Sequence, residues 1–176
     1  GTFEIAEAFK DQFHGIELKI FSQKNLGAGA ARNRAIDEGT GDWLAFLDAD
    51  DEWLPKKLAI SMKAINKHNL VLVAHNYFAV NGGQKKPVDC NARYDAATNP
   101  YRGLYCKGFI ATSSVIVRRD AVLDAGGFDE TLATAQDFDL WLNILKKEDA
   151  NFRIEPDVLL NYFITPGSIT SYTSRR

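Results

Sequence analysis

The chain has 176 residues, of which 45% are hydrophobic and 25% charged, and its formal net charge at pH 7 is −2. This length and composition are those of one ordinary globular domain and exclude a disordered or fibrous protein. The weak negative charge, with no basic run beyond isolated pairs, excludes a general attraction to nucleic acid, so we expect no nucleic acid partner. No apolar stretch approaches the roughly 20 residues that a membrane-spanning helix needs.

The cysteines and the N-terminal segment bear on where and how the protein works. Cys90 and Cys106 form no metal-ligand pattern, which is typical of free thiols in a reducing compartment. We therefore expect a cytoplasmic protein, and peripheral association with the inner face of a membrane is compatible with that location. Residues 3–13 have an amphipathic helix pattern where an α/β domain usually begins with a strand. We expect the single domain, residues 1–176, to be incomplete at its N-terminus.

Strand and helix patterns alternate along the chain. The predicted strands cover residues 16–21, 43–47, 70–80, 112–117 and 152–163. The predicted helices cover residues 28–38, 56–67, 119–125 and 137–147. Residues 81–106 are polar and rich in Gly, Pro and Asn, which predicts a long surface loop, and a loop of this length in a compact domain is usually functional or disordered. The alternation predicts an α/β fold with a mostly parallel central sheet and helices on both faces.

The apolar strand predicted at 43–47 ends in a dense cluster of acids. Four negative charges fall within five positions, at Asp48, Asp50, Asp51 and Glu52. Such crowding is unfavourable unless a cation neutralises it. Mg²⁺ often uses one or two protein carboxylates and takes further oxygen ligands from substrate phosphates. Because ligands of open α/β sheets bind outside the carboxyl ends of strands, the cluster predicts a site for a metal-bound phosphate.

Acid clusters of this kind also occur in calcium loops, in phosphatases and in plain solvated turns. A calcium loop that starts at Asp48 needs Gly at its sixth position and Glu at its twelfth, where the chain has Trp53 and Ala59. Phosphatases with an aspartyl nucleophile place two acids similarly, but the Thr or Val that follows in them is absent here. A solvated turn that caps the next helix stays open as an alternative to the metal–phosphate site.

A glycine-rich turn precedes the helix predicted at 28–38. The run from Gly27 to Arg32 follows a predicted strand as a dinucleotide-binding fingerprint does, but Arg32 replaces the third glycine. A tight turn with small residues, which lets the helix approach the sheet, accounts for the run equally well. Arg32 could still reach a nucleotide, because guanidinium groups pair with phosphate and stack on bases.

A third candidate group opens the helix predicted at 137–147. Asp137 lies at its N-terminus, where the macrodipole favours a negative side chain. Helix capping is the simple role for Asp137. The functional role is that of a general base that removes a proton from an acceptor hydroxyl. Asp139 points to a different helical face, so it does not easily share that role.

These stretches, at 25–33, 43–58 and 117–141, resemble family 2 glycosyltransferases, which have the GT-A fold. The middle stretch is the most specific of the three. The resemblance implies a GT-A domain that lacks the first nucleotide-binding strands. It also implies that Asp48 contacts the ribose of a nucleotide sugar and that Asp50 holds a Mn²⁺ or Mg²⁺ ion on the diphosphate, as in the family's Asp-x-Asp motif.

The same resemblance implies roles for residues on either side of this motif. Arg32 corresponds to an arginine that approaches the nucleotide base, and Asn25 and Gly27 belong to the donor-binding turn. Asp137 corresponds to the catalytic base, the second member of an acidic pair whose first member is Gln136 in this chain.

One departure concerns the metal. Many relatives have a histidine near the end of the domain that has been proposed as a metal ligand, and this chain has Thr165 there.

The expected function is an inverting transfer of a sugar from a nucleoside-diphosphate sugar, such as a UDP-sugar, to a hydroxyl group, in bacterial-type polysaccharide or glycoconjugate synthesis. Saccharides, lipid-linked saccharides and proteins are all open as acceptors. Two alternatives remain: a metal-dependent nucleotidyltransferase, and an inactive fragment that acts as a binding domain. An incomplete sheet would expose an unpaired edge, through which copies of the chain could form a homo-oligomer.

Overall fold

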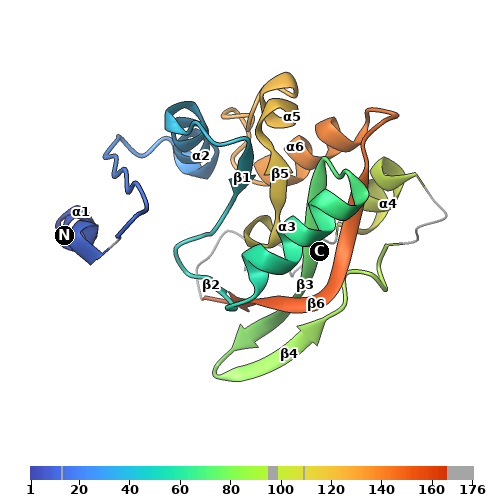
Figure 1. The fold of residues 1–176 in the computed structure, drawn as a ribbon, viewed down its shortest axis with the longest axis horizontal. Coiled ribbons are helices and arrows are strands. Elements are labelled where there is room, and N and C mark those ends of the chain that lie inside the picture. The colour runs from blue at the N-terminus through green and yellow to red at the C-terminus, as the bar shows by residue number, and fades with distance from the viewer. Residues whose placement is uncertain (13, 95–98, 109, 166–176) are drawn as a thin grey trace.

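The computed structural model describes residues 1–12, 14–94, 99–108 and 110–165 (Figure 1). The helices are α1 (Thr2–Ala8), α2 (Gly27–Glu38), α3 (Lys57–His68), α4 (Pro100–Lys107), α5 (Arg119–Asp124) and α6 (Gln136–Leu145), with the 3-10 turns η1 (Lys10–Gln12) and η2 (Thr112–Ser114). The strands are β1 (Trp43–Ala45), β2 (Glu52–Trp53), β3 (Leu72–Asn81), β4 (Gln84–Val88), β5 (Ile116–Arg118) and β6 (Phe152–Phe163). None of the helices in these ranges is long and apolar enough to cross a membrane.

The strands form one mixed sheet in the order β1-β5-β3-β6-β2, and β4 also pairs with β3. The α/β class is confirmed, but the expectation of a mostly parallel sheet is wrong for the described strands. Only β3 and β6 pair in parallel there, whereas the other four pairs are antiparallel. One reason is that β5 runs between β1 and β3 in the opposite direction. The other is that Gly82 and Gly83, both with positive φ, turn β3 directly back into β4.

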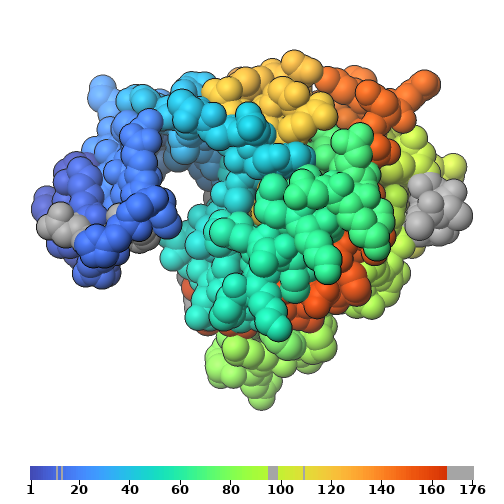
Figure 2. Space-filling model, viewed as in Figure 1, coloured from blue at the N-terminus to red at the C-terminus, as the bar shows by residue number. Residues whose placement is uncertain are grey.

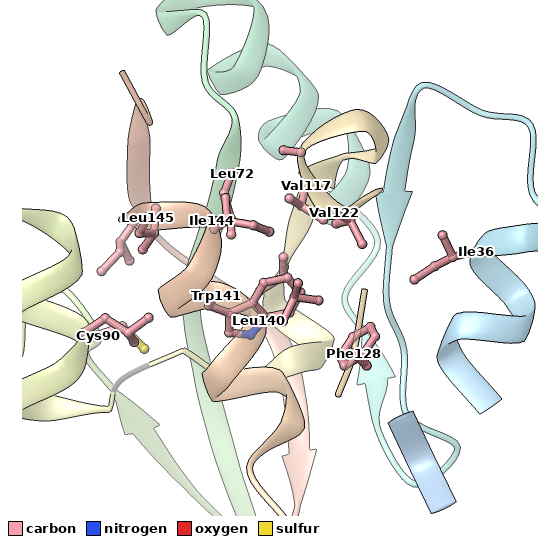
Figure 3. Close-up of a cluster of buried hydrophobic side chains, with 14 residues drawn as sticks. Ile36, Leu72, Cys90, Val117, Val122, Phe128, Leu140, Trp141, Ile144 and Leu145 are labelled. Carbon is pink, nitrogen blue, oxygen red and sulfur yellow. The ribbon is translucent and has the colours of Figure 1, made fainter. Parts of the chain in front are cut away.

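Helices cover both faces of the sheet, as expected. Neighbouring residues of a strand point to opposite faces, so each strand serves two apolar clusters. Leu72 and Val117 belong to the larger cluster, which includes residues of α2, α5 and α6, whereas Val73 and Ile116 belong to the smaller one under α3. Trp141 of α6 is fully buried in the larger cluster (Figure 3). The core therefore holds α6 firmly, and with it the residues at the start of that helix.

Residues 112–117, expected as one strand, begin with the 3-10 turn η2, and β5 covers only Ile116–Arg118. Other stretches differ from the sequence-based expectation as well. Residues 16–21 form no strand, and they run apart from the sheet (Figure 1). A strand needs a neighbour to satisfy its backbone groups, and alternation of apolar residues does not provide one. Residues 81–106 contain β4 and α4 rather than one long loop, although residues 95–98 lie outside the described ranges. The side chain of Asn99 caps α4 by accepting a hydrogen bond from the Arg102 N–H group at 3.4 Å.

The N-terminal helix α1 covers only the first part of the helix pattern at residues 3–13, and its apolar face is not buried. None of its residues is buried, and Phe3, Ile5 and Phe9 at or beside it are exposed. In the space-filling view the N-terminal segment (blue) projects from the body of the molecule (Figure 2). The candidate site consequently depends on α2 and the elements that follow it.

Candidate active site

A cavity of about 280 Å³ brings together three of the residues singled out in the sequence. Arg32 comes from α2, Asp48 from the loop that follows β1, and Asp137 from the first turn of α6. The rest of the lining comes from Ala28, Tyr77, Gly108, Ile110, Ala111, Thr112, Ala135, Gln136 and Tyr162. Charged residues far apart in the chain thus share one pocket with two aromatic side chains.

The Arg32 and Asp48 side chains form an ion pair inside this cavity, between Nη2 and Oδ1. The guanidinium group also lies over the ring of Phe128, 5.4 Å from its centroid. Phe128 is buried and is tied to the same helix by Asn33, which accepts from its N–H group at 2.8 Å and donates to its carbonyl oxygen at 2.9 Å. Arg32 is therefore held between a carboxylate and an aromatic face.

Asn25 and Gly27, expected at the donor site, shape the turn before α2 and are not part of the cavity lining. The Asn25 Oδ1 atom accepts a hydrogen bond from the Gly27 N–H group at 3.1 Å. Gly27 has a φ of 92°, a conformation that side-chain-bearing residues rarely adopt. Their structural role is to start α2 so that Arg32, one turn later, reaches the pocket.

The acids of the loop from residue 48 to residue 52, which we call the acid loop, differ in what they contact. Asp51 is half-buried and accepts from the Ser113 hydroxyl at 2.5 Å and from the Phe163 N–H group at 3.1 Å. Burial raises the pKa of the Asp51 carboxyl, and these two hydrogen bonds act in the opposite direction. Glu52 accepts from the Asn161 side chain at 2.6 Å. These two acids bind the loop to the sheet, whereas Asp48 pairs with Arg32 in the cavity and Asp50 is exposed.

Asp50 has the chemistry that a hard cation on a diphosphate requires. It is exposed, it forms no ion pair with a described residue, and its Oδ2 atom accepts from the Thr165 hydroxyl at 3.2 Å. The described residues contain no group of three or more His, Cys, Asp or Glu side chains able to enclose a metal. Carboxylate and hydroxyl oxygens suit Mg²⁺ or Mn²⁺, and phosphate oxygens commonly complete such sites. The side chains present fit a metal that arrives with its substrate.

Asp137 does not cap α6, because the N-cap residue is Ala135 in a left-handed conformation. Its Oδ2 atom accepts a hydrogen bond from the Thr112 hydroxyl, and its Oδ1 atom accepts from the Phe138 N–H group at 2.8 Å. Asp139 instead accepts from Asn143 at 3.0 Å, on another side of the helix, as expected. The carboxylate that lines the cavity is therefore that of Asp137.

The structure adds residues that no sequence motif indicated. Thr112 contacts Asp137, and Tyr77 and Tyr162 line the cavity from the adjacent strands β3 and β6 with ring centroids 5.5 Å apart. Burial raises the pKa of Tyr77 to about 12, so its hydroxyl stays protonated at neutral pH. The only signal in the sequence was the aromatic character of both strands, which core packing explains equally well.

Comparison with known structures and sequences identifies the class of protein to which this fold and pocket belong. The structure superposes on that of TarS from S. aureus in complex with UDP-GlcNAc with a TM-score of 0.74 and 20% sequence identity, covering 97% of this chain and 48% of that one. TarS has the GT-A glycosyltransferase fold, and the expected fold is thereby confirmed.

Sequence comparison then gives the family. Residues 1–126 match the profile of the glycosyl transferase family 2, and the chain belongs to this family. It is 30% identical to the amylovoran biosynthesis glycosyltransferase AmsB of Erwinia amylovora over 139 residues, covering 74% of this chain and 45% of AmsB. It is also 30% identical to the UDP-Glc:alpha-D-GlcNAc-diphosphoundecaprenol beta-1,3-glucosyltransferase WfaP of Escherichia coli over 154 residues, 83% of this chain and 54% of WfaP. The chain thus spans about half the length of these relatives.

Proposed function

We propose that this domain transfers a sugar from a nucleoside-diphosphate sugar to a hydroxyl group, with inversion at the anomeric carbon. The observation that carries the proposal is the convergence of Arg32, Asp48 and Asp137 on one cavity from three separate elements. An arginine and a carboxylate suit the nucleotide end of a donor, and a second carboxylate suits an acceptor hydroxyl. The family match supports glycosyl transfer over nucleotidyl transfer.

On the donor side, Asp48 binds the ribose and Arg32 lies near the nucleotide base, with Asn25 and Gly27 forming the turn that presents Arg32. The donor that we propose is a UDP-sugar, because WfaP is named for UDP-Glc and TarS was crystallised with UDP-GlcNAc. The names of AmsB and WfaP likewise favour polysaccharide or lipid-linked saccharide synthesis as the setting. A lipid-linked acceptor would place the reaction at the inner face of a membrane.

Asp50 is the protein ligand that we propose for a Mn²⁺ or Mg²⁺ ion, with the Thr165 hydroxyl beside it. When bound, such an ion offsets the negative charge that grows on the departing diphosphate. The protein contributes an exposed carboxylate whose loop is already anchored through Asp51 and Glu52. The loop that carries Asp50 is therefore already fixed, and binding of the ion would require little reordering of it.

On the acceptor side, Asp137 accepts the proton of the attacking hydroxyl. The hydroxyl oxygen forms a bond to the anomeric carbon while the bond from that carbon to the diphosphate oxygen breaks, and the nucleoside diphosphate leaves with the bonding electrons. Because attack and departure occur on opposite sides of the carbon, one displacement inverts its configuration. General-base assistance of this kind accelerates reactions by about 10²- to 10⁴-fold.

The test is the release of UDP from UDP-glucose and from UDP-N-acetylglucosamine, with water as acceptor, in the presence of Mn²⁺ or of EDTA. We expect release that depends on the metal, with the freed sugar first appearing by NMR as the β-anomer. Binding of UDP without turnover would make the domain a non-catalytic binding module. Formation of pyrophosphate from UTP and a sugar phosphate would identify a nucleotidyltransferase. Absence of both binding and turnover would refute the proposal.

A further inference from the structure

The turn η2 lies in the core and contacts two separate parts of the candidate site. Thr112, Ser113 and Ser114 are 4%, 1% and 0% exposed. Three hydroxyl side chains in a row are uncommon in a core, because a buried hydroxyl is unfavourable unless it has hydrogen-bond partners. The partners of these three residues lie on the acid loop, on α6 and just before the turn itself. The turn is therefore placed to act on both the donor side and the acceptor side of the pocket.

Ser113 holds the acid loop. Its hydroxyl accepts a hydrogen bond from the Asp48 N–H group at 3.1 Å and donates one to the Asp51 carboxylate at 2.5 Å. Its carbonyl oxygen accepts from the Trp53 Nε1 atom at 2.9 Å. Ser113 thus bonds to the first residue of the acid loop, to Asp51 within it and to Trp53 directly after it, on both sides of Asp50. Hydrogen bonds to charged groups are among the stronger ones in proteins, so the bond to Asp51 contributes most to this hold.

Thr112 holds the candidate base. Its hydroxyl donates to the Oδ2 atom of Asp137, while the Oδ1 atom accepts from the Phe138 N–H group at 2.8 Å. With a bond to each oxygen, the rotation of the carboxylate about its own axis is restricted. Thr112 also lines the cavity, so the contact lies inside the site.

The turn is itself anchored in the core. The buried Nζ atom of Lys57 in α3 donates to the Ser114 carbonyl oxygen at 3.3 Å. This backbone contact involves neither the acid loop nor Asp137. It fixes the turn in the core, so Thr112 and Ser113 hold their partners from a fixed position.

We propose that η2 is the element that positions the two halves of the active site relative to each other, with Thr112 as the positioning residue for Asp137 and Ser113 as the positioning residue for the acid loop. This inference rests on the proposed function for its catalytic consequence. The structural part of the inference, that one turn is hydrogen-bonded to both the acid loop and Asp137, does not depend on the proposed function. The two contacts serve different steps, so their removal should change different kinetic constants.

Thr112→Val removes the hydroxyl at nearly constant volume and should lower kcat about tenfold, a fraction of what a general base supplies, with KM for the UDP-sugar unchanged. Thr112→Ser keeps a hydroxyl and should restore kcat. Ser113→Ala should instead weaken binding of UDP with Mn²⁺ about tenfold and raise the donor KM, because a charge-assisted hydrogen bond is lost. A loss of general stability would not separate kcat from KM in this way.

The matched control is Ser114→Ala. It deletes an equally buried hydroxyl from the same turn, but the hydrogen bond that this hydroxyl makes in the described part of the chain ends at Ala111, just before the turn. We expect this variant to lose stability while keeping wild-type kcat and UDP affinity.

Hydrogen exchange of the 176-residue chain, followed by mass spectrometry, tests the positioning without reference to activity. Ser113→Ala should speed exchange of the amides at 48–53 about tenfold, and Thr112→Val that of the amides at 136–139, whereas Ser114→Ala should affect neither segment selectively. If neither segment responds, the inference is wrong even for an active enzyme. If both respond but the wild-type protein neither binds UDP with Mn²⁺ nor releases it from a UDP-sugar, the positioning stands and the proposed function fails.

Discussion

The guanidinium group of Arg32 is paired with the carboxylate of Asp48, sixteen positions further along the chain. The Arg32 side chain is 18% exposed and that of Asp48 37%, so the pair is partly shielded from solvent and open on one side. The two groups that we assign to the nucleotide therefore hold each other in place before a donor arrives. Because the ion pair already fixes both side chains, little conformational entropy is lost when a nucleotide binds, which favours binding.

Arg32→Lys should weaken the binding of UDP about tenfold or more. Lysine keeps the charge but loses the planar group that pairs with Asp48 and lies over Phe128. Calorimetric titration with UDP and Mn²⁺ measures the effect. Arg34→Lys is the control, because Arg34 pairs with Glu38 on the exposed side of the same helix. Equal affinities of the two variants for UDP would show that Arg32 does not contribute to donor binding.

Asp137→Asn should lower kcat for sugar transfer by about 10²- to 10⁴-fold, while the affinity for UDP changes little. The amide can still accept from Thr112 but cannot take up a proton from the acceptor. Steady-state kinetics with a UDP-sugar and calorimetry with UDP separate the two quantities. Asp139→Asn, two residues further on the same helix and bonded to Asn143, should behave as wild type. A parallel loss of UDP affinity in Asp137→Asn would argue against its role as a base.

Asp50→Ala should make nucleotide binding insensitive to the metal. The wild-type protein should bind UDP on the order of tenfold more tightly with Mn²⁺ than with EDTA, since the ion that we propose at Asp50 would add its attraction for the diphosphate. Titrations of both proteins under both conditions test this. Glu52→Gln serves as the control, because Glu52 in the same loop is bonded to Asn161 and should leave the response to Mn²⁺ intact.

The stability of the fold should depend on pH through Lys57. Burial lowers the pKa of this lysine from its usual 10.5 to about 7. Between pH 7 and pH 10.5 the Lys57 side chain thus binds more protons in the unfolded chain than in the folded one, so its contribution to the free energy of unfolding rises with pH over this range. This contribution is lost as the pH falls to about 7, where the buried group becomes charged in the folded state.

Lys57→Met should flatten this dependence and make the protein relatively more stable on the acid side, by a few kcal/mol before the lost bond to Ser114 is subtracted. Urea unfolding at pH 6.5, 8 and 9.5 provides the measurement. Lys63→Met, at an exposed position of the same helix, should keep the wild-type slope. Identical slopes for all three proteins would mean that Lys57 titrates normally.

Gly127→Ala should destabilise the protein more than Gly126→Ala. Both glycines have positive φ, at 74° and 89°, so alanine is strained at either position. A Cβ at Gly126 meets nothing within 4 Å, whereas one at Gly127 would lie 2.8 Å from the Asn33 Oδ1 atom. Because Asn33 ties Phe128 to α2, we expect a loss of about 1–3 kcal/mol at Gly127 and about 1 at Gly126, measured by thermal unfolding. Equal losses in the free energy of unfolding would show that the Asn33 side chain moves away from the added Cβ at little cost.

The elements near the site show which parts of the fold local sequence patterns can predict. The helix predicted at 28–38 is α2, and the one predicted at 137–147 is α6, each within two residues at either end. Their apolar spacing and the glycine or lysines that follow them are short-range features, so the sequence displays them directly. The alternation at 16–21 was equally local, but it predicted a strand that does not form. A strand depends on a neighbour that alternation alone does not reveal.

The sequence by itself determined that an acid run follows an apolar strand, that an arginine follows a glycine turn, and that an acid opens the late helix. Those facts sufficed for the family and for Arg32, Asp48 and Asp137 as candidates. Only the tertiary structure decided that these three share one cavity, that Asp51 serves the fold, and that Ser113, 65 positions from Asp48, holds its loop. The direction of β5 and the approach of η2 result from packing between distant segments. Such contacts depend on which surfaces pack against each other when the core forms. The periodicity within one segment does not predict them.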